Sequence, residues 1–211
     1  MRIICYGDSN TFGYIPGRGG RYNRHTRWPG VLQDLLGSSY EVIEEGLCGR
    51  TTVFEDRTEP GRCGLDRITE AVTEHGPADL LILMLGSNDC KTQFQASPEQ
   101  ITKGMEQIAE KARACAGRDI PILLIAPAAM TEQVMKSGFG SEFDQQSVKV
   151  SQELADTFEK LAARCGCHFL DGSKAAKVSE TDGLHLDEKG HQKLAEAVKS
   201  KVIDLTETQK M

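Results

Sequence analysis

The sequence has no apolar run long enough to cross a membrane and no surplus of positive charge. Its longest apolar runs, residues 80–85 and 120–126, fall well short of the roughly 20 residues that a membrane-spanning helix needs. The 25 Lys and Arg residues are outnumbered by 31 Asp and Glu, so the net charge is −6. Proteins that bind nucleic acid need many basic side chains against the phosphates. We therefore expect neither a membrane protein nor a nucleic-acid binder.

The sequence also lacks the signals of secretion and of bound cofactors. No basic segment with an apolar stretch and a cleavage site precedes the first apolar run. The seven cysteines are an odd number without disulfide-scaffold spacing, which predicts a reduced, cytoplasmic protein. Cys165 and Cys167 lie close together without a second pair at zinc-ligand spacing, so they are interpreted as structural thiols. A dinucleotide fingerprint, a P-loop and a Gly-x-Ser-x-Gly elbow are absent too, and we expect no metal and no cofactor.

Apolar runs typical of strands alternate with segments whose apolar residues recur at helical spacing. Strands are predicted at residues 3–6, 40–44, 80–85, 120–126 and 168–170, and helices at 28–36, 65–72, 99–115, 148–163 and 188–203. This order favours an α/β fold with a central parallel five-stranded sheet and helices on both faces. No linker or repeat divides the chain, which predicts a single domain over residues 1–211. Two long stretches, 11–27 and 130–146, are expected to be loops that form lids or pocket walls.

Three of the predicted strands are followed by polar, glycine-containing turns. Ser9 follows the first strand, Gly49 comes after the second, and Asn88 follows the third. In parallel sheets such turns meet at the edge where α/β proteins bind ligands. A serine there can act as a nucleophile, and a glycine N–H or an asparagine amide can donate to an oxyanion. Taken singly, Ser9 is better explained as a helix cap, and the other two as cap or turn residues.

A fourth polar turn, before the last predicted helix, contains an aspartate and a histidine. Among the five histidines, only His185 has an aspartate, Asp182, three residues before it. A serine hydroxyl needs an adjacent base, and the imidazole needs a carboxylate that fixes its tautomer. Alone, His185 would be interpreted as a surface or capping histidine. The joint placement of all four turns at one sheet edge instead predicts a nucleophile, a base, an orienting carboxylate and oxyanion donors.

These segments resemble the sequence blocks of the SGNH hydrolases, the GDSL-type esterases. The Gly-Asp-Ser-Asn segment around Ser9 is similar to the first block, although Asn10 stands where leucine is usual. Gly49, Asn88 and the Asp182-x-x-His185 pair match the other blocks. The similarity extends to residues 27–32, 41–47 and 84–89, which look like the arylesterase and acyltransferase branch. The resemblance covers most of the first ninety residues and the C-terminal block.

The resemblance implies a flavodoxin-like, three-layer α/β/α sandwich and an esterase mechanism. Ser9 would be the nucleophile, His185 the base and Asp182 its orienter. The N–H groups of Ser9 and Gly49 and the side chain of Asn88 would form the oxyanion hole. The change from leucine to asparagine at position 10 removes no catalytic group, but it is expected to alter packing behind the nucleophile.

The function expected from these residues is hydrolysis of a small-molecule ester with a short acyl group, acetyl to butyryl. The scarcity of long apolar segments argues against a lipase with an interfacial lid. A carbohydrate-ester deacetylase or an acyltransferase would use the same residues, and the sequence does not distinguish them. The resembling branch includes oligomers, so a homo-oligomer is an alternative to a monomer.

Two interpretations from other classes compete with an esterase. A non-catalytic binding module could keep the fold, but the full set of catalytic residue types disfavours it. A phosphate- or nucleotide-binding flavodoxin-like protein is supported only by a basic cluster, which in an acidic chain is better explained as a solvated or subunit-contacting loop. The cluster consists of Arg18, Arg21, Arg24, Arg27 and His25.

Trp28 is expected to pack in the core. Cys48 and Cys90, which flank the predicted oxyanion donors, are expected to be small buried residues.

Overall fold

The computed structural model describes residues 1–208 and contains one five-stranded sheet in which every neighbouring pair is parallel. The spatial order of the strands is β2-β1-β3-β4-β5. Their bounds are Arg2–Gly7 for β1, Glu41–Gly46 for β2, Leu80–Met84 for β3, Ile122–Ala126 for β4 and His168–Asp171 for β5. The predicted sheet is confirmed, with strand ends displaced by at most two residues.

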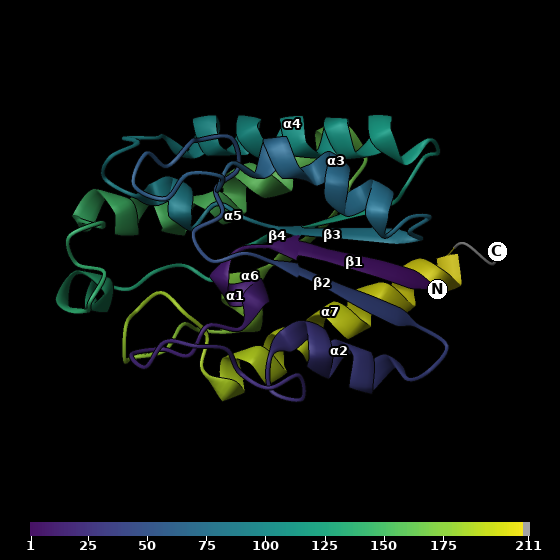
Figure 1. Cartoon of the computed structure of the whole chain (residues 1–211), viewed down its shortest axis with the longest axis horizontal. Helices are drawn as coiled ribbons and strands as arrows, with labels where there is room; N and C mark the ends of the chain where they lie inside the picture. The colour runs from purple at the N-terminus through teal and green to yellow at the C-terminus, as the bar shows by residue number, and fades with distance from the viewer. Residues whose placement is uncertain (209–211) are drawn as a thin grey trace.

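Helices cover both faces of this sheet, which confirms the predicted three-layer sandwich (Figure 1). One layer contains α3 (Gly64–Glu74), α4 (Pro98–Ala116) and α5 (Gln145–Cys165). The other contains α2 (Trp28–Leu36) and α7 (Glu188–Thr208), which pack against each other. Two one-turn helices, α1 (Ser9–Phe12) and α6 (Gly172–Ala175), follow strand ends. No helix within residues 1–208 is long and apolar enough to cross a membrane.

The strand sequences explain why the sheet is buried between these layers. Every residue of β3 is buried, and alternate side chains face opposite cores. Leu81 and Leu83 belong to the core under α3–α5, whereas Leu80 and Ile82 belong to the core under α2 and α7. The edge strand β2 is mostly half-buried, since it has a neighbour on one side only. Trp28 is fully buried in the second core, as predicted.

The long helices were predicted from apolar spacing, and two of them also begin with a side-chain cap, whereas α2 and α3 do not. Ser97 and Gln100 form a capping box before α4, and Asp144 and Ser147 form another before α5. The segment 130–146 was predicted as a loop, but it contains a 3₁₀ turn at Glu132–Lys136. This turn, the 3₁₀ turn at Asn88–Cys90, and α1 and α6 are too short to give a helical period in the sequence.

The strand order places a topological switch point between β1 and β3. From β1 the chain moves to β2 on one side, and it then crosses to β3 on the other side. Gly7 at the end of β1 pairs in register with Met84 at the end of β3. Ligands of open α/β sheets bind outside the carboxyl ends of strands at such a point. The segments carrying Ser9 and Asn88 leave the sheet there.

Candidate active site

Ser9 is held at the carboxyl end of β1 by the one-turn helix α1. Asp8, not Ser9, caps this helix, because its carboxylate accepts the Asn10 N–H at 2.9 Å. A Cβ at Gly7 would lie 2.0 Å from Thr11 Oγ1, so glycine lets the helix fold closely against the strand end. The Ser9 hydroxyl is therefore not used as a cap, contrary to the simplest interpretation of the sequence.

The structure brings Ser9, His185 and Asp182 into one hydrogen-bonded array. His185 Nε2 lies 2.9 Å from Ser9 Oγ, and its Nδ1 lies 2.8 Å from Asp182 Oδ2. All three residues are buried. Burial pushes the pKa of Asp182 upward, but the hydrogen bond and charge of His185 outweigh it, so the pKa lies below its usual value. The ionised carboxylate can fix the Nδ1–H tautomer, which leaves Nε2 to accept the Ser9 proton.

The turn that carries Asp182 and His185 is ordered by its own backbone. Asp182 Oδ1 accepts the N–H groups of Leu184 at 3.1 Å and of His185 at 2.9 Å. The carbonyl of His185 accepts the Ser179 N–H at 2.7 Å. Gly183 has φ +67°, and a Cβ there would lie 2.6 Å from Val134 N. The turn therefore needs glycine between the aspartate and the histidine.

Asn88 and Gly49 line the same cavity as Ser9. The Asn88 amide donates to the Arg50 carbonyl at 3.1 Å, which fixes its orientation. An amide nitrogen carries two hydrogens, so a second N–H remains for a ligand. Gly49 has φ 77° in the turn after β2, and its N–H forms no hydrogen bond within residues 1–208. The predicted oxyanion donors are thus next to Ser9 and have unused donor capacity.

Asp89 connects the two turns that carry these donors, a role that was not predicted. Its buried carboxylate accepts the Thr52 N–H at 2.9 and 3.1 Å and also the Thr52 hydroxyl. Burial raises the pKa of Asp89 to about 6 despite these bonds, and it raises the pKa of Asp8 to about 6 as well. An aspartate directly after the strand-end asparagine was the only sequence signal, and it did not indicate Thr52 as partner.

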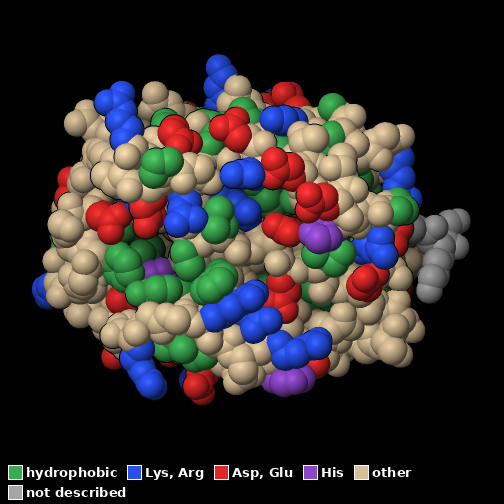
Figure 2. All heavy atoms as spheres, in the orientation of Figure 1, with side chains coloured by type: hydrophobic (Ala, Val, Ile, Leu, Met, Phe, Trp, Pro, Cys, Tyr) green, Lys and Arg blue, Asp and Glu red, His purple; other side chains and the backbone are tan. Residues whose placement is uncertain are grey.

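A cavity of about 300 Å³ opens over Ser9 and His185. Figure 2 shows a hollow lined by hydrophobic side chains, with a histidine inside it, where Figure 1 places the carboxyl ends of the strands. The ring of Tyr14 lies 4.4 Å from that of His185 between centroids, and the ring of Phe139 lies 5.2 Å from it. Both long stretches predicted as pocket walls, 11–27 and 130–146, therefore contribute to the lining.

Charged residues complete the lining of this cavity. They include Glu59, Lys91 and Glu142. The buried Lys91 ammonium pairs with Asp56 at 2.9 Å and with Glu142 at 2.7 Å. Because its two partners come from different segments, Lys91 holds these two parts of the wall together.

Cys48 corrects one expectation from the sequence. It is half-exposed and lines the cavity, whereas Cys90 is buried as expected. Cys48 lies in the turn after the edge strand β2, where fewer neighbours cover it. Burial nevertheless raises the pKa of its thiol to about 11, so the thiolate that would attack an ester is scarce at neutral pH. The position of Ser9 beside His185 makes the serine the better nucleophile.

Three members of the basic cluster in loop 11–27 form ion pairs within the protein. Arg21 and Arg27 both pair with Glu44, and His25 lies 2.7 Å from Asp34. None of the cluster's residues lines the cavity over Ser9. The basic cluster therefore supplies no charge to the cavity over Ser9.

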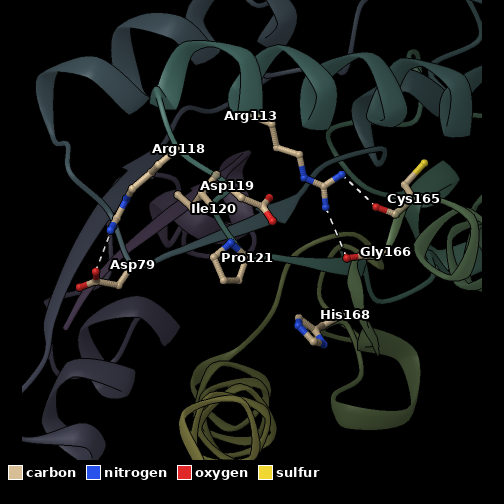
Figure 3. A pocket seen from close by; sticks show the side chains of 9 residues that line it. All are labelled: Asp79, Arg113, Arg118, Asp119, Ile120, Pro121, Cys165, Gly166 and His168. Atoms are coloured by element: carbon tan, nitrogen blue, oxygen red, sulfur yellow. Dashed lines mark hydrogen bonds and ion pairs between the residues drawn. The ribbon is translucent and has the colours of Figure 1, made fainter. Parts of the chain in front are cut away.

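A second cavity, of about 730 Å³, lies at the amino ends of β3, β4 and β5, on the side of the sheet away from Ser9 (Figure 3). Arg118 pairs there with Asp79 at 3.0 Å, and Arg113 donates to the Cys165 carbonyl at 2.9 Å. Both guanidinium groups of this second cavity are thus paired within the protein, and the residues that line the cavity provide no serine–histidine pair.

Within residues 1–208, no group of three or more His, Cys, Asp or Glu side chains is arranged to hold a metal ion, and this includes the region of Cys165 and Cys167.

The fold and the site together define a class of protein. A three-layer α/β sandwich with a serine–histidine–aspartate array at the carboxyl edge of its sheet is the arrangement of SGNH-type carboxylic ester hydrolases, as the sequence predicted. The chain belongs to the GDSL-like Lipase/Acylhydrolase family, whose model matches residues 5–193.

Solved structures similar to this chain include esterases of two kinds. A carbohydrate acetylesterase from Sinorhizobium meliloti is 31% identical with a TM-score of 0.92, over 97% of this chain and 99% of that one. An aryl esterase from M. smegmatis is 32% identical with a TM-score of 0.91, over the same shares of the two chains. An acetylxylan esterase from Xylanibacter ruminicola is 24% identical over 94% of this chain, which spans only 42% of that relative's length.

Proposed function

We propose that the chain hydrolyses short-chain carboxylic esters through an acyl-enzyme on Ser9. The observation that carries this proposal is the array in which His185 lies 2.9 Å from Ser9 Oγ and 2.8 Å from Asp182 Oδ2, under a cavity of about 300 Å³. This arrangement matches the roles of nucleophile, general base and orienting carboxylate in serine hydrolases.

The reaction proceeds in two acyl-transfer steps. His185 Nε2 takes the proton of Ser9 as Oγ attacks the acyl carbonyl, and the oxyanion accepts hydrogen bonds from the Ser9 and Gly49 N–H groups and from Asn88. The carbon–oxygen bond to the alcohol then breaks, and the alcohol leaves with the proton from His185. A water molecule repeats the attack on the acyl-enzyme, with His185 again as base, and releases the acid and free Ser9.

A short acyl group, acetyl to butyryl, suits this site. The cavity is about 300 Å³ in volume and must hold both the acyl group and part of the alcohol. That is the lower end of the range for small-molecule pockets. The similar protein named above as a carbohydrate acetylesterase agrees with a small acyl group.

A carbohydrate ester is the second candidate substrate, and the lining of the cavity favours it. Glu59 and Glu142 bring carboxylates that can accept hydrogen bonds from sugar hydroxyls. Tyr14 and Phe139 bring aromatic surface beside His185, where the alcohol part must leave. If sugars bind there, Glu59→Gln lowers kcat/KM for acetylated xylose more than for p-nitrophenyl acetate. The exposed Glu70→Gln, outside the cavity, changes neither and serves as the control.

A p-nitrophenyl ester series tests the main proposal. We expect kcat/KM to be highest for acetate to butyrate and to fall for the octanoate. Ser9→Ala should lower kcat by about 10⁴–10⁶, on the scale of other serine nucleophiles. Ser200→Ala, at an exposed serine on α7 outside the cavity, should leave activity unchanged. Near-normal turnover by Ser9→Ala, or an optimum at eight carbons, would contradict the proposal.

A further inference from the structure

Asn10 connects the nucleophile segment to the backbone on both sides of His185. It lies directly after Ser9 and is 5% exposed. Its Nδ2 donates to the carbonyl of Leu184 at 3.3 Å, and its Oδ1 accepts the N–H of Leu186 at 2.8 Å. One side chain therefore binds the residues immediately before and after the histidine, which lie more than 170 positions away in the chain.

The other hydrogen bonds around His185 come from its own turn or, in the case of the Thr131 N–H that the Gly183 carbonyl accepts at 3.0 Å, from the segment after β4. Asp182 accepts the His185 N–H, and the His185 carbonyl accepts the Ser179 N–H. These bonds order the turn and connect it to the segment after β4, but none of them connects it to the segment that carries Ser9. The bonds that do so are the two from Asn10 and the one between Ser9 Oγ and His185 Nε2.

The serine–histidine bond is lost at one stage of the proposed reaction. When Ser9 is acylated, Oγ becomes an ester oxygen without a proton to donate. His185 must nevertheless remain in position, because it takes the proton from the water that attacks the acyl carbonyl. At that stage the Asn10 bonds are still intact.

We propose that Asn10 is a positioning residue that keeps His185 in place while Ser9 is acylated, and so acts mainly on deacylation. This inference rests on the proposed function. Where SGNH hydrolases usually have leucine, this chain has a side chain that makes two hydrogen bonds to the histidine turn. A leucine is similar in size but can form neither bond.

Asn10→Leu is therefore the variant that tests the proposal, with p-nitrophenyl acetate mixed rapidly with enzyme. We expect the deacylation rate to fall by about 10–100-fold and the acylation rate by no more than about threefold, because a misplaced base costs rate and the Ser9–His185 bond still positions His185 before acylation but not after it. The variant then shows a burst of one nitrophenol per site, and its acetyl-enzyme accumulates in intact-mass spectra.

Thr102→Val is the matched control. Thr102 makes a partly buried hydrogen bond to Thr157 between α4 and α5 and does not line the cavity. It should lower the unfolding temperature without producing a burst. The proposal is wrong if Asn10→Leu slows both steps equally, leaves both unchanged, or loses activity only in proportion to its unfolded fraction. Failure of the proposed function is distinguishable, because the wild-type protein would then not hydrolyse this ester faster than the Ser9→Ala variant.

Discussion

The Asn88 side chain shows how the site prepares a hydrogen-bond donor. One N–H of its amide is bound to the Arg50 carbonyl at 3.1 Å, so the group is held in one orientation before substrate arrives. The second N–H of the amide remains free to donate a hydrogen bond to an oxyanion, as does the backbone N–H of Gly49. Such preorganised donors cost no reorganisation when charge develops, which is why they stabilise a transition state more than water does.

Asn88→Ala tests this assignment at the residue scale. We expect kcat for p-nitrophenyl acetate to fall by about 10²–10³, with KM changed little, because the donor acts on the developing oxyanion. Steady-state kinetics give both constants, and thermal unfolding shows whether the variant is folded at the assay temperature. A loss of less than about tenfold would place the oxyanion elsewhere.

Asp182→Asn tests the orienting carboxylate. The variant keeps the size of the side chain but removes the charge that fixes the Nδ1–H tautomer of His185. We expect kcat to fall by about 10⁴, the scale of the same change in serine proteases. Because Asp182 Oδ1 also accepts two N–H groups of the turn, thermal unfolding must accompany the kinetics. A folded variant that retains more than about a tenth of wild-type kcat would show that His185 does not need this carboxylate.

Close contact between strand β2 and helix α1 positions Ser9, the proposed nucleophile. A Cβ at Gly46, the last residue of β2, would lie 2.1 Å from the Phe12 N and 2.5 Å from the Thr11 carbonyl carbon. Both atoms belong to the backbone of the helix that carries Ser9. A side chain at position 46 therefore has to displace α1 or the strand end.

Gly46→Ala should destabilise the protein and reduce its activity together. We expect the free energy of unfolding to fall by about 1–3 kcal/mol, the usual cost of overpacking. The matched control is Gly138→Ala, where a Cβ would meet nothing within 4 Å and the change should stay within about 0.5 kcal/mol. Urea unfolding followed by circular dichroism measures both, and equal stability of the two variants would contradict the contact.

The sequence predicted the helices and strands better than the side-chain contacts between distant parts of the chain. The strands and long helices follow from apolar periodicity, which is a local property. The roles of Asp89 and Asn10 depend on partners that are 37 and more than 170 positions away, and nothing local specifies such contacts. Ser9, Gly49, Asn88, Asp182 and His185 could be proposed as site residues because each follows a recognisable strand end or matches a family block. The exposure of Cys48 depends on β2 being an edge strand, which the strand pattern did not reveal.

His191 links the stability of the whole molecule to pH. It is fully buried on α7, and its Nδ1 accepts the N–H of Trp28 at the start of α2, at 3.2 Å. Burial lowers its pKa to about 3 from an ordinary value of 6.5. In the unfolded chain His191 is therefore protonated below about pH 6.5, whereas in the folded protein it stays neutral down to about pH 3. Stability is lost as the pH falls through this window.

His191→Asn removes this titration while keeping an acceptor for the Trp28 N–H. Between pH 7 and pH 5, the free energy of unfolding of the wild-type protein should fall by about 2 kcal/mol more than that of the variant. Both proteins share the raised pKa values of Asp8 and Asp89, so the difference isolates the histidine. Parallel pH curves from urea unfolding would show that His191 titrates normally in the folded state.

The central claim, that Ser9 is the nucleophile, is tested most directly by covalent labelling with diethyl p-nitrophenyl phosphate. We predict release of one nitrophenol per chain, complete loss of esterase activity and a diethylphosphoryl group on the peptide that contains Ser9. The Ser9→Ala variant should take up no label. A label on Cys48, or full labelling of Ser9→Ala, would contradict the account.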